Sequence, residues 1–240
     1  MDAVPGVGPP IRHSKTMTDS LSNSIRAKHA AAWERVVTHP LVLELGDGTL
    51  PIEKFRTYFV QDYIFVKDLV AMMGLAIAKS PDLGNASAPI NRFLEGVLNP
   101  ENDLFVRALR ELNASEGELT AAVASPATQG FVDFLTRVGH EGTFDEIVTV
   151  LYVTEGTYLD WATRLINAGR VPKNEFYKGW IDLHGPAALG DIVAWLGSHL
   201  DAIPPDSRSP RTDWLARTAL SYELMFWEQA YSGVGLEWPK

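Results

Sequence analysis

FRTYFVQDYIFV, residues 55–66, carries aromatic and aliphatic side chains at helical spacing on two neighbouring stripes. One stripe holds Phe55, Phe59, Tyr63 and Val66, and the other holds Tyr58, Asp62, Phe65 and Leu69. A helix that is apolar around so much of its circumference is typical of the centre of a bundle. We therefore expect this segment to be a core helix that carries the carboxyl group of Asp62 inside an apolar surface.

The remainder of the chain also shows helical spacing, with recognisable start and stop signals. Thr143 and Glu146 have the form of a capping box, and Gly169 is a suitable C-terminal stop. No segment alternates as a strand does, and no internal repeat is present. Helices are expected over residues 24–38, 51–80, 85–112, 125 to about 140, 143–169 and 174–200, and from residue 209 onward. The segment 85–112 should be interrupted near Asn99-Pro100, and the segment 174–200 should break at His184-Gly185-Pro186.

This pattern predicts a single all-α domain of seven or more helices over residues 23–240. Residues 1–22 are rich in Gly, Pro, Ser and Thr, and we expect them to form a flexible leader.

The composition excludes several classes of function. The net charge is −9 and no stripe of Lys and Arg is present, which argues against a nucleic-acid partner. No apolar run approaches the roughly 20 residues of a membrane span, and the N-terminus lacks the apolar block of a secretory signal. The chain has no cysteine, so it forms no disulfide and no thiolate metal site. We therefore expect a cytoplasmic protein with no membrane partner.

Three acids, Asp62, Glu155 and Glu223, fall among apolar residues of long helical segments. An unpaired carboxylate is costly to bury, so such a group has a partner, a raised pKa or a function. Each acid alone is best explained as a structural hydrogen-bonding group. Three together favour a polar pocket inside the bundle.

His184 is a further candidate because it lies at a helix break, although a lone histidine is more often structural. We find no Glu-x-x-His pair of a di-iron bundle, no glycine-rich phosphate loop and no Gly-x-Ser-x-Gly motif. The sequence therefore predicts no metal and no cofactor.

The run HPLVLELGDGTLP (residues 39–51), followed by Phe55, Tyr58 and Gln61-Asp62-Tyr63, resembles the TenA/thiaminase II family. Residues 152–161, 177–185 and 221–231 agree with later blocks of that family, so the resemblance covers about residues 25–235. It implies a haem-oxygenase-like helical bundle that binds no haem, assembled as a homo-oligomer (dimer or tetramer). Members hydrolyse a C–N bond in pyrimidine breakdown products of thiamin, and many cleave thiamin itself.

The resemblance also assigns residues. One branch of the family uses a cysteine thiol as nucleophile, and that cysteine aligns with Thr154. A second branch works without the thiol, and Glu155 resembles its acid. The second branch is associated with amino- and formylamino-pyrimidines. Asp62 would bind the edge of the pyrimidine, Glu223 would act as an acid or base, and Tyr158 would orient the site. His184 and Phe65 stand where the thiol branch has tyrosines. The expected substrate-binding set is Asp62, Phe65, Tyr58, Thr154, His184 and Trp227.

Hydrolysis of an amide requires a base that activates water and an acid that protonates the leaving amine. We expect Glu155 to be the base and Glu223 the donor, although these roles can be exchanged. Two other functions stay open at this point. One is a regulatory or ligand-binding protein that binds a pyrimidine without turnover, and the other is an oxidoreductase, which would need metal ligands that the sequence does not reveal.

Overall fold

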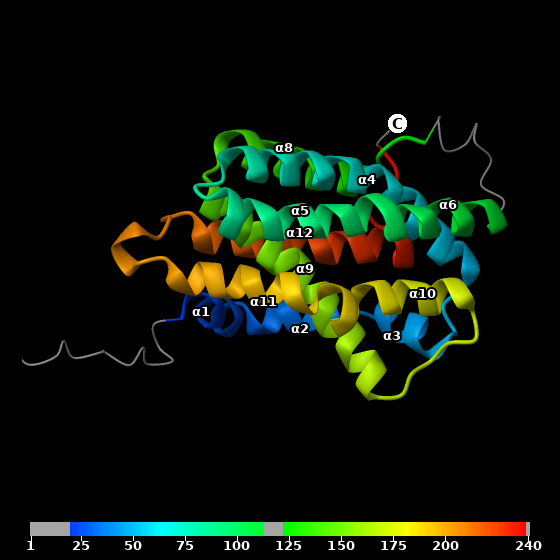
Figure 1. Cartoon of the computed structure of the whole chain (residues 1–240). Helices are drawn as coiled ribbons and strands as arrows, with labels where there is room; N and C mark the ends of the chain where they lie inside the picture. Colours follow the sequence, from blue (N-terminus) through cyan, green and yellow to red (C-terminus); the bar gives the residue numbers. More distant parts are fainter. Residues whose placement is uncertain (1–19, 113–121, 239–240) are drawn as a thin grey trace, which may run out of the picture.

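The computed structural model describes residues 20–112 and 122–238, and every regular element in these ranges is helical. This confirms the all-α fold class. The elements are α1 (Leu21–Lys28), α2 (Ala30–Val37), α3 (Pro40–Asp47), α4 (Ile52–Lys79), η2 (Leu83–Ser87), α5 (Ala88–Gly96), η3 (Val97–Glu101), α6 (Asn102–Glu111), α8 (Pro126–Glu141), α9 (Phe144–Asn167), α10 (Glu175–His184), α11 (Pro186–Ala202), η4 (Pro205–Ser207) and α12 (Thr212–Ser232) (Figure 1).

Helix α9 runs through the middle of the bundle, and α4 lies beside α8 along one side of it (Figure 1). Helix α4 packs along α8 and also contacts α5, α6, α9 and α12, as expected for a helix with two apolar stripes. Helix α9 packs against α11, α12, α10 and α2, and its stretch from Phe144 to Thr157 is buried except for Asp145. Asp62 lies on the buried face of α4 and Glu155 on the buried stretch of α9, so both carboxyl groups are removed from water.

Local capping explains where the central helices begin and end. The side chain of Thr143 accepts from the amide of Glu146, and the Glu146 carboxylate accepts from the amide of Thr143, which is the predicted capping box at the start of α9. Gly169 follows the helix with a φ of 67°, a conformation that glycine adopts without strain. Ser125 caps α8 through the amide of Thr128.

The structure also departs from the sequence-based boundaries. Residues 24–38 form two helices that meet at His29, and α3 was not assigned from the sequence. Helix α1 begins at Leu21 and so includes the last two residues of the expected leader, and residues 1–19 lie outside the described part of the chain. No helix among the described residues combines the length and hydropathy that a membrane crossing requires.

The predicted interruption near Asn99-Pro100 is a π-helical turn, η3, between α5 and α6. Pro100 lacks the N–H that an α-helix would use at this position, and a wider turn accommodates it without ending the helix. The chain therefore stays helical from η2 to the end of α6, and the turn displaces the residues that follow the proline relative to a regular α-helix.

Candidate active-site cavity

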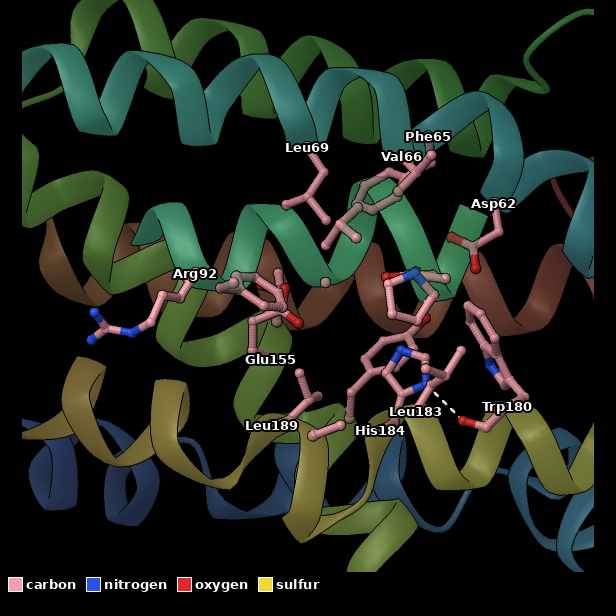
Figure 2. A pocket seen from close by; sticks show the side chains of 18 of the residues that line it. Asp62, Phe65, Val66, Leu69, Arg92, Glu155, Trp180, Leu183, His184 and Leu189 are labelled. Atoms are coloured by element: carbon pink, nitrogen blue, oxygen red, sulfur yellow. Dashed lines mark hydrogen bonds between the residues drawn. The ribbon is translucent and has the colours of Figure 1, made fainter. Parts of the chain in front are cut away.

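A cavity of about 220 Å³ lies between α4, α5, η3, α9, α10, α11 and α12. Its polar lining consists of Asp62, Arg92, Glu101, Thr154, Glu155, Tyr158, Trp180, His184 and Glu223. Its apolar walls include Phe65, Val66, Leu69, Phe93, Val97, Leu183 and Leu189. Figure 2 shows Asp62 and Glu155 reaching into this space from α4 and α9, with Trp180 and His184 along the α10 side. The size suits one small ligand, and the lining is mostly apolar with a few convergent polar groups.

Helical spacing explains how separate segments supply the site. Asp62 and Phe65 are three residues apart on α4, so they share one face, and Glu155 and Tyr158 have the same spacing on α9. Glu223 projects from the apolar face of α12 and is 2% exposed. Asp62 and Glu155 are buried as well. Three helices distant in sequence thus bring their acids to the same cavity.

Burial controls the charge of these acids. Desolvation raises the pKa of Asp62 to about 7, partly opposed by the hydroxyl of Tyr58. Desolvation raises the pKa of Glu155 to about 8, with the Thr154 hydroxyl opposing the rise and Asp62 adding to it. The pKa of Glu223 lies well above its ordinary value because of desolvation and the nearby Glu155 and Asp62. Protons are therefore available inside the cavity near neutral pH.

No basic side chain neutralises these acids from within the cavity. Among the described residues that line it, Arg92 is the only Lys or Arg, and it is exposed. In Figure 2 its guanidinium group lies at the edge, directed away from Asp62 and Glu155. The cavity is therefore suited to a ligand that donates hydrogen bonds or carries positive charge.

Hydroxyl groups support two of the acids. Thr154 Oγ1 donates either to the carbonyl oxygen of Leu151 or to Glu155 Oε1, each at 3.2 Å. The hydroxyl oxygens of Tyr58 and Tyr158 lie 3.1 Å apart, and Tyr58 also interacts with Asp62. Glu155 and Asp62 are held in place by these neighbours, as a functional group on a rigid helix should be.

His184 is held in its neutral form. Its Nδ1 lies 2.8 Å from the carbonyl oxygen of Trp180, so this nitrogen carries the proton and donates it (Figure 2). Desolvation lowers the pKa of the imidazole to about 4, although the hydrogen bond opposes the change. The ring packs against Tyr158 with centroids 4.7 Å apart. Nε2 is left as a hydrogen-bond acceptor, because a neutral imidazole has one nitrogen of each kind.

Most of the residues singled out from the sequence line the cavity, namely Asp62, Phe65, Thr154, Glu155, Tyr158, His184 and Glu223. Tyr58 and Trp227 do not line it. They form a second layer, in which the Trp227 ring lies 5.1 Å from that of Tyr58 and 5.4 Å from that of Tyr158, measured between centroids.

The sequence analysis missed Glu101, a fourth carboxyl group in the cavity wall. Desolvation raises its pKa well above the ordinary value, and Asp62 and Glu155 add to the rise. Glu101 directly follows Pro100 in a helical segment, and this proline was the only local signal of an irregular turn. Trp180 was also missed as a lining residue.

Within residues 20–112 and 122–238, no group of three or more His, Asp or Glu residues is arranged to hold a metal ion. The chemistry available to the described side chains is that of carboxyl groups, hydroxyl groups and a neutral imidazole around a small apolar cavity. Such a set can bind the polar edge of a heterocycle and move protons to and from it.

Known proteins resemble this chain over most of its length. Residues 26–233 match the model of the TENA/THI-4/PQQC family. Proteins named aminopyrimidine aminohydrolase are 26% identical over 202 residues in Helicobacter pylori (83% of this chain, 93% of the relative) and 26% identical over 217 residues in Bacillus subtilis strain 168 (89% and 91%). A Saccharomyces cerevisiae protein named hydroxymethylpyrimidine/phosphomethylpyrimidine kinase THI20 is 21% identical over 82% of this chain and 36% of its own length.

Solved structures show the same fold. A TenA family protein described as a transcription regulator, from Silicibacter sp. TM1040, superposes with a TM-score of 0.77 at 24% identity and covers 90% of this chain and 100% of its own. A TenA homologue from P. horikoshii OT3 superposes with a TM-score of 0.76 at 23% identity, and the match covers 88% of this chain and 98% of the homologue. These matches confirm the helical, haem-oxygenase-like bundle that the resemblance implied.

Proposed function

This chain belongs to the TENA/THI-4/PQQC family, and we propose that it is an aminopyrimidine aminohydrolase that salvages pyrimidine breakdown products of thiamin. The observation that carries this proposal is the convergence of Asp62, Glu155 and Glu223 on one small cavity that holds no interior basic group. A pyrimidine with amino substituents matches such a cavity, because it offers several donors on a flat apolar ring.

Asp62 binds the edge of the pyrimidine. A ring nitrogen and a neighbouring amino group form one acceptor and one donor, and a protonated carboxyl group matches both at once. With a pKa of about 7, Asp62 is able to supply its protonated form near neutral pH. Phe65 and Leu69 of the same helix supply apolar contacts for the ring.

Glu155 and Glu223 divide the proton transfers. Glu155 in its ionised form removes a proton from water, whose oxygen attacks the carbon of the C–N bond. Glu223, whose pKa is raised well above its ordinary value, holds its proton and gives it to the nitrogen that leaves. Water is consumed and an amine is released, so atoms and charge balance. Thr154 donates to Glu155 and favours its ionised form.

The absence of cysteine supports the proposal that this chain belongs to the branch that works without a thiol. The resemblance aligns Thr154 with the nucleophile of the other branch, and the hydroxyl of Thr154 donates to Leu151 O or to Glu155. Amino- and formylamino-pyrimidines are therefore the proposed substrates, and no cofactor takes part. We place the protein in the cytoplasm as a homo-oligomer, a dimer or tetramer.

The direct test is incubation of the purified protein with an aminopyrimidine and with a formylaminopyrimidine, while the release of ammonia and of formate is followed. We expect turnover of both compounds by the wild type, and at least a hundredfold loss of formate release from the formylaminopyrimidine in Glu223→Gln. Tight pyrimidine binding with no release of either product would instead support a regulatory, ligand-binding role. No binding and no turnover would reject the substrate class.

A further inference from the structure

The π-helical turn η3 gives Glu101 its position in the cavity wall. Pro100 and Glu101 both line the cavity, together with Val97 of the same turn. A π turn inside an α-helix is uncommon and is frequent at functional sites, because it re-aims the residues that it contains. The irregular backbone therefore coincides with the one carboxyl group of this helical segment that reaches the cavity.

Among the described residues around Glu101 are three other acids, and no positively charged side chain is directed at them. The cavity also receives Asp62 from α4, Glu155 from α9 and Glu223 from α12. His184 from α10 is neutral, and Arg92 from α5 lies exposed at the edge. Within the described residues, no hydrogen bond or ion pair is formed by the carboxyl group of Glu101. Four carboxyl groups in about 220 Å³ cannot all ionise unless a cation enters.

The proposed reaction supplies such a cation. An aminohydrolase replaces an amino group by a hydroxyl group, so substrate and product differ at one substituent. An amine on a saturated carbon is an ammonium ion at neutral pH, whereas the alcohol is neutral. A site that prefers substrate to product needs a negative group at that substituent, and Asp62, Glu155 and Glu223 already have other roles.

We propose that Glu101 is a specificity residue. It pairs with the substrate amine that the reaction replaces, and so distinguishes that amine from the hydroxyl group of the product. This inference rests on the proposed function. When the ammonium ion enters, Glu101 releases its proton to solvent, so the net charge of the cavity does not change. The nitrogen of such a substrate is then already protonated, and the proton of Glu223 is required mainly when the leaving nitrogen is a neutral amide.

The test compares an aminomethyl-pyrimidine with the matching hydroxymethyl-pyrimidine by calorimetry at about pH 7. The wild type should prefer the amine and release a proton on binding it, as measured in two buffers of different ionisation enthalpy. Glu101→Gln should bind the amine about 10- to 100-fold more weakly and release less proton, with unchanged affinity for the alcohol. Glu101→Asp keeps the charge and should retain the proton release and part of the preference.

The matched control is Glu95→Gln on α5. Glu95 is exposed, accepts from the side chain of Asn91 and does not line the cavity. The Glu95→Gln variant should bind the amine and the alcohol as the wild type does. If Glu101→Gln is poorly folded by circular dichroism, Glu101→Asp and the proton release of the wild type carry the test.

Two results overturn the inference, and both differ from a failure of the proposed function. Equal losses for amine and alcohol in Glu101→Gln would show a structural role, and an unchanged preference would show that Glu101 does not contact the amine. In either case the wild type still binds and hydrolyses the aminopyrimidine. A wild type that binds neither compound would reject the proposed function itself.

Discussion

The hydroxyl oxygens of Tyr58 and Tyr158 lie 3.1 Å apart and join the two central helices, α4 and α9, beside the cavity. Tyr158 lines the cavity, whereas Tyr58 lies behind it and interacts with Asp62. The pair therefore connects a residue of the cavity wall to the carboxyl group proposed to bind the pyrimidine edge. Substitutions of the two tyrosines should have different effects.

Tyr58→Phe should raise the pKa of Asp62 above about 7, because it removes the hydroxyl contact that opposes desolvation. If protonated Asp62 binds the pyrimidine, the affinity of the wild type falls as pH rises through about 7, and the midpoint in Tyr58→Phe moves to higher pH. Calorimetric titrations from about pH 5.5 to 9 measure both midpoints. Tyr158→Phe is the comparison variant and should move this midpoint less, since Tyr58 is the hydroxyl that contacts Asp62 and Tyr158 is joined to it through Tyr58. Superimposable profiles for wild type and Tyr58→Phe would contradict this coupling.

Asp62→Ala should weaken pyrimidine binding while the helical content stays unchanged. It leaves the ring nitrogen and amino group of the ligand unpaired in a closed cavity, which costs roughly 1–3 kcal/mol, or more if a charge is involved. Calorimetry and circular dichroism on the same samples provide the measurement. Equal affinities for wild type and variant would place Asp62 outside the binding site and return it to a structural role.

Glu155→Gln and Glu223→Gln should each lower turnover of a formylaminopyrimidine by about 10²–10⁴, the usual loss for a general acid or base. In the wild type, kcat at saturating substrate should rise with pH up to about 8, because the base must be ionised and the pKa of Glu155 is about 8. That rising limb should disappear in Glu155→Gln. Initial rates across pH test both statements, and near-normal turnover in both variants would reject the mechanism.

The buried acid should also affect stability in a pH-dependent way. The folded-state pKa of Glu155 is raised to about 8, so between about 4.5 and 8 the folded state binds more protons than the unfolded state. Stability is then greatest at low pH and falls as pH rises through this window, by up to about 1.4 kcal/mol per pH unit for this group. Gln has no such titration, so the melting temperature of Glu155→Gln relative to wild type should increase from about pH 5 to about pH 8. A constant difference in thermal melts would show that Glu155 is not titrating.

Thiamin should not be cleaved at an appreciable rate, because expulsion of the thiazole by substitution needs a strong nucleophile. Although Glu155 Oε1 lies 3.2 Å from Thr154 Oγ1, a hydroxyl remains a much weaker nucleophile than a thiolate. Thr154→Val should retain aminopyrimidine hydrolysis. The rising limb of its pH profile should move to higher pH, since Glu155 loses a hydrogen bond that lowers its pKa. Release of thiazole by the wild type, or complete inactivity of a folded Thr154→Val, would instead identify Thr154 as the nucleophile.

Much of the site was accessible from the sequence because periodicity fixes which helix face a residue occupies. Asp62, Glu155 and Glu223 were recognised as acids on apolar faces, and all three line one cavity. The capping box at Thr143 likewise depends only on neighbours in sequence, and it forms as expected. Such local rules act within one or two helical turns, so a sequence is enough to apply them.

Other features depended on packing between helices. Pro100 indicated an irregularity in the sequence, but not whether the helix would end there or continue through a π turn. The surrounding bundle decided for the π turn, and this turn places Glu101 in the cavity wall. Helical spacing also could not separate lining residues such as Tyr158 from second-layer residues such as Tyr58 and Trp227. By itself the sequence determined the helices, their buried faces and the identity of the acids, because these follow from local periodicity. Only the tertiary structure decided which acids share one desolvated space, because burial and charge repulsion depend on helices that are distant along the chain.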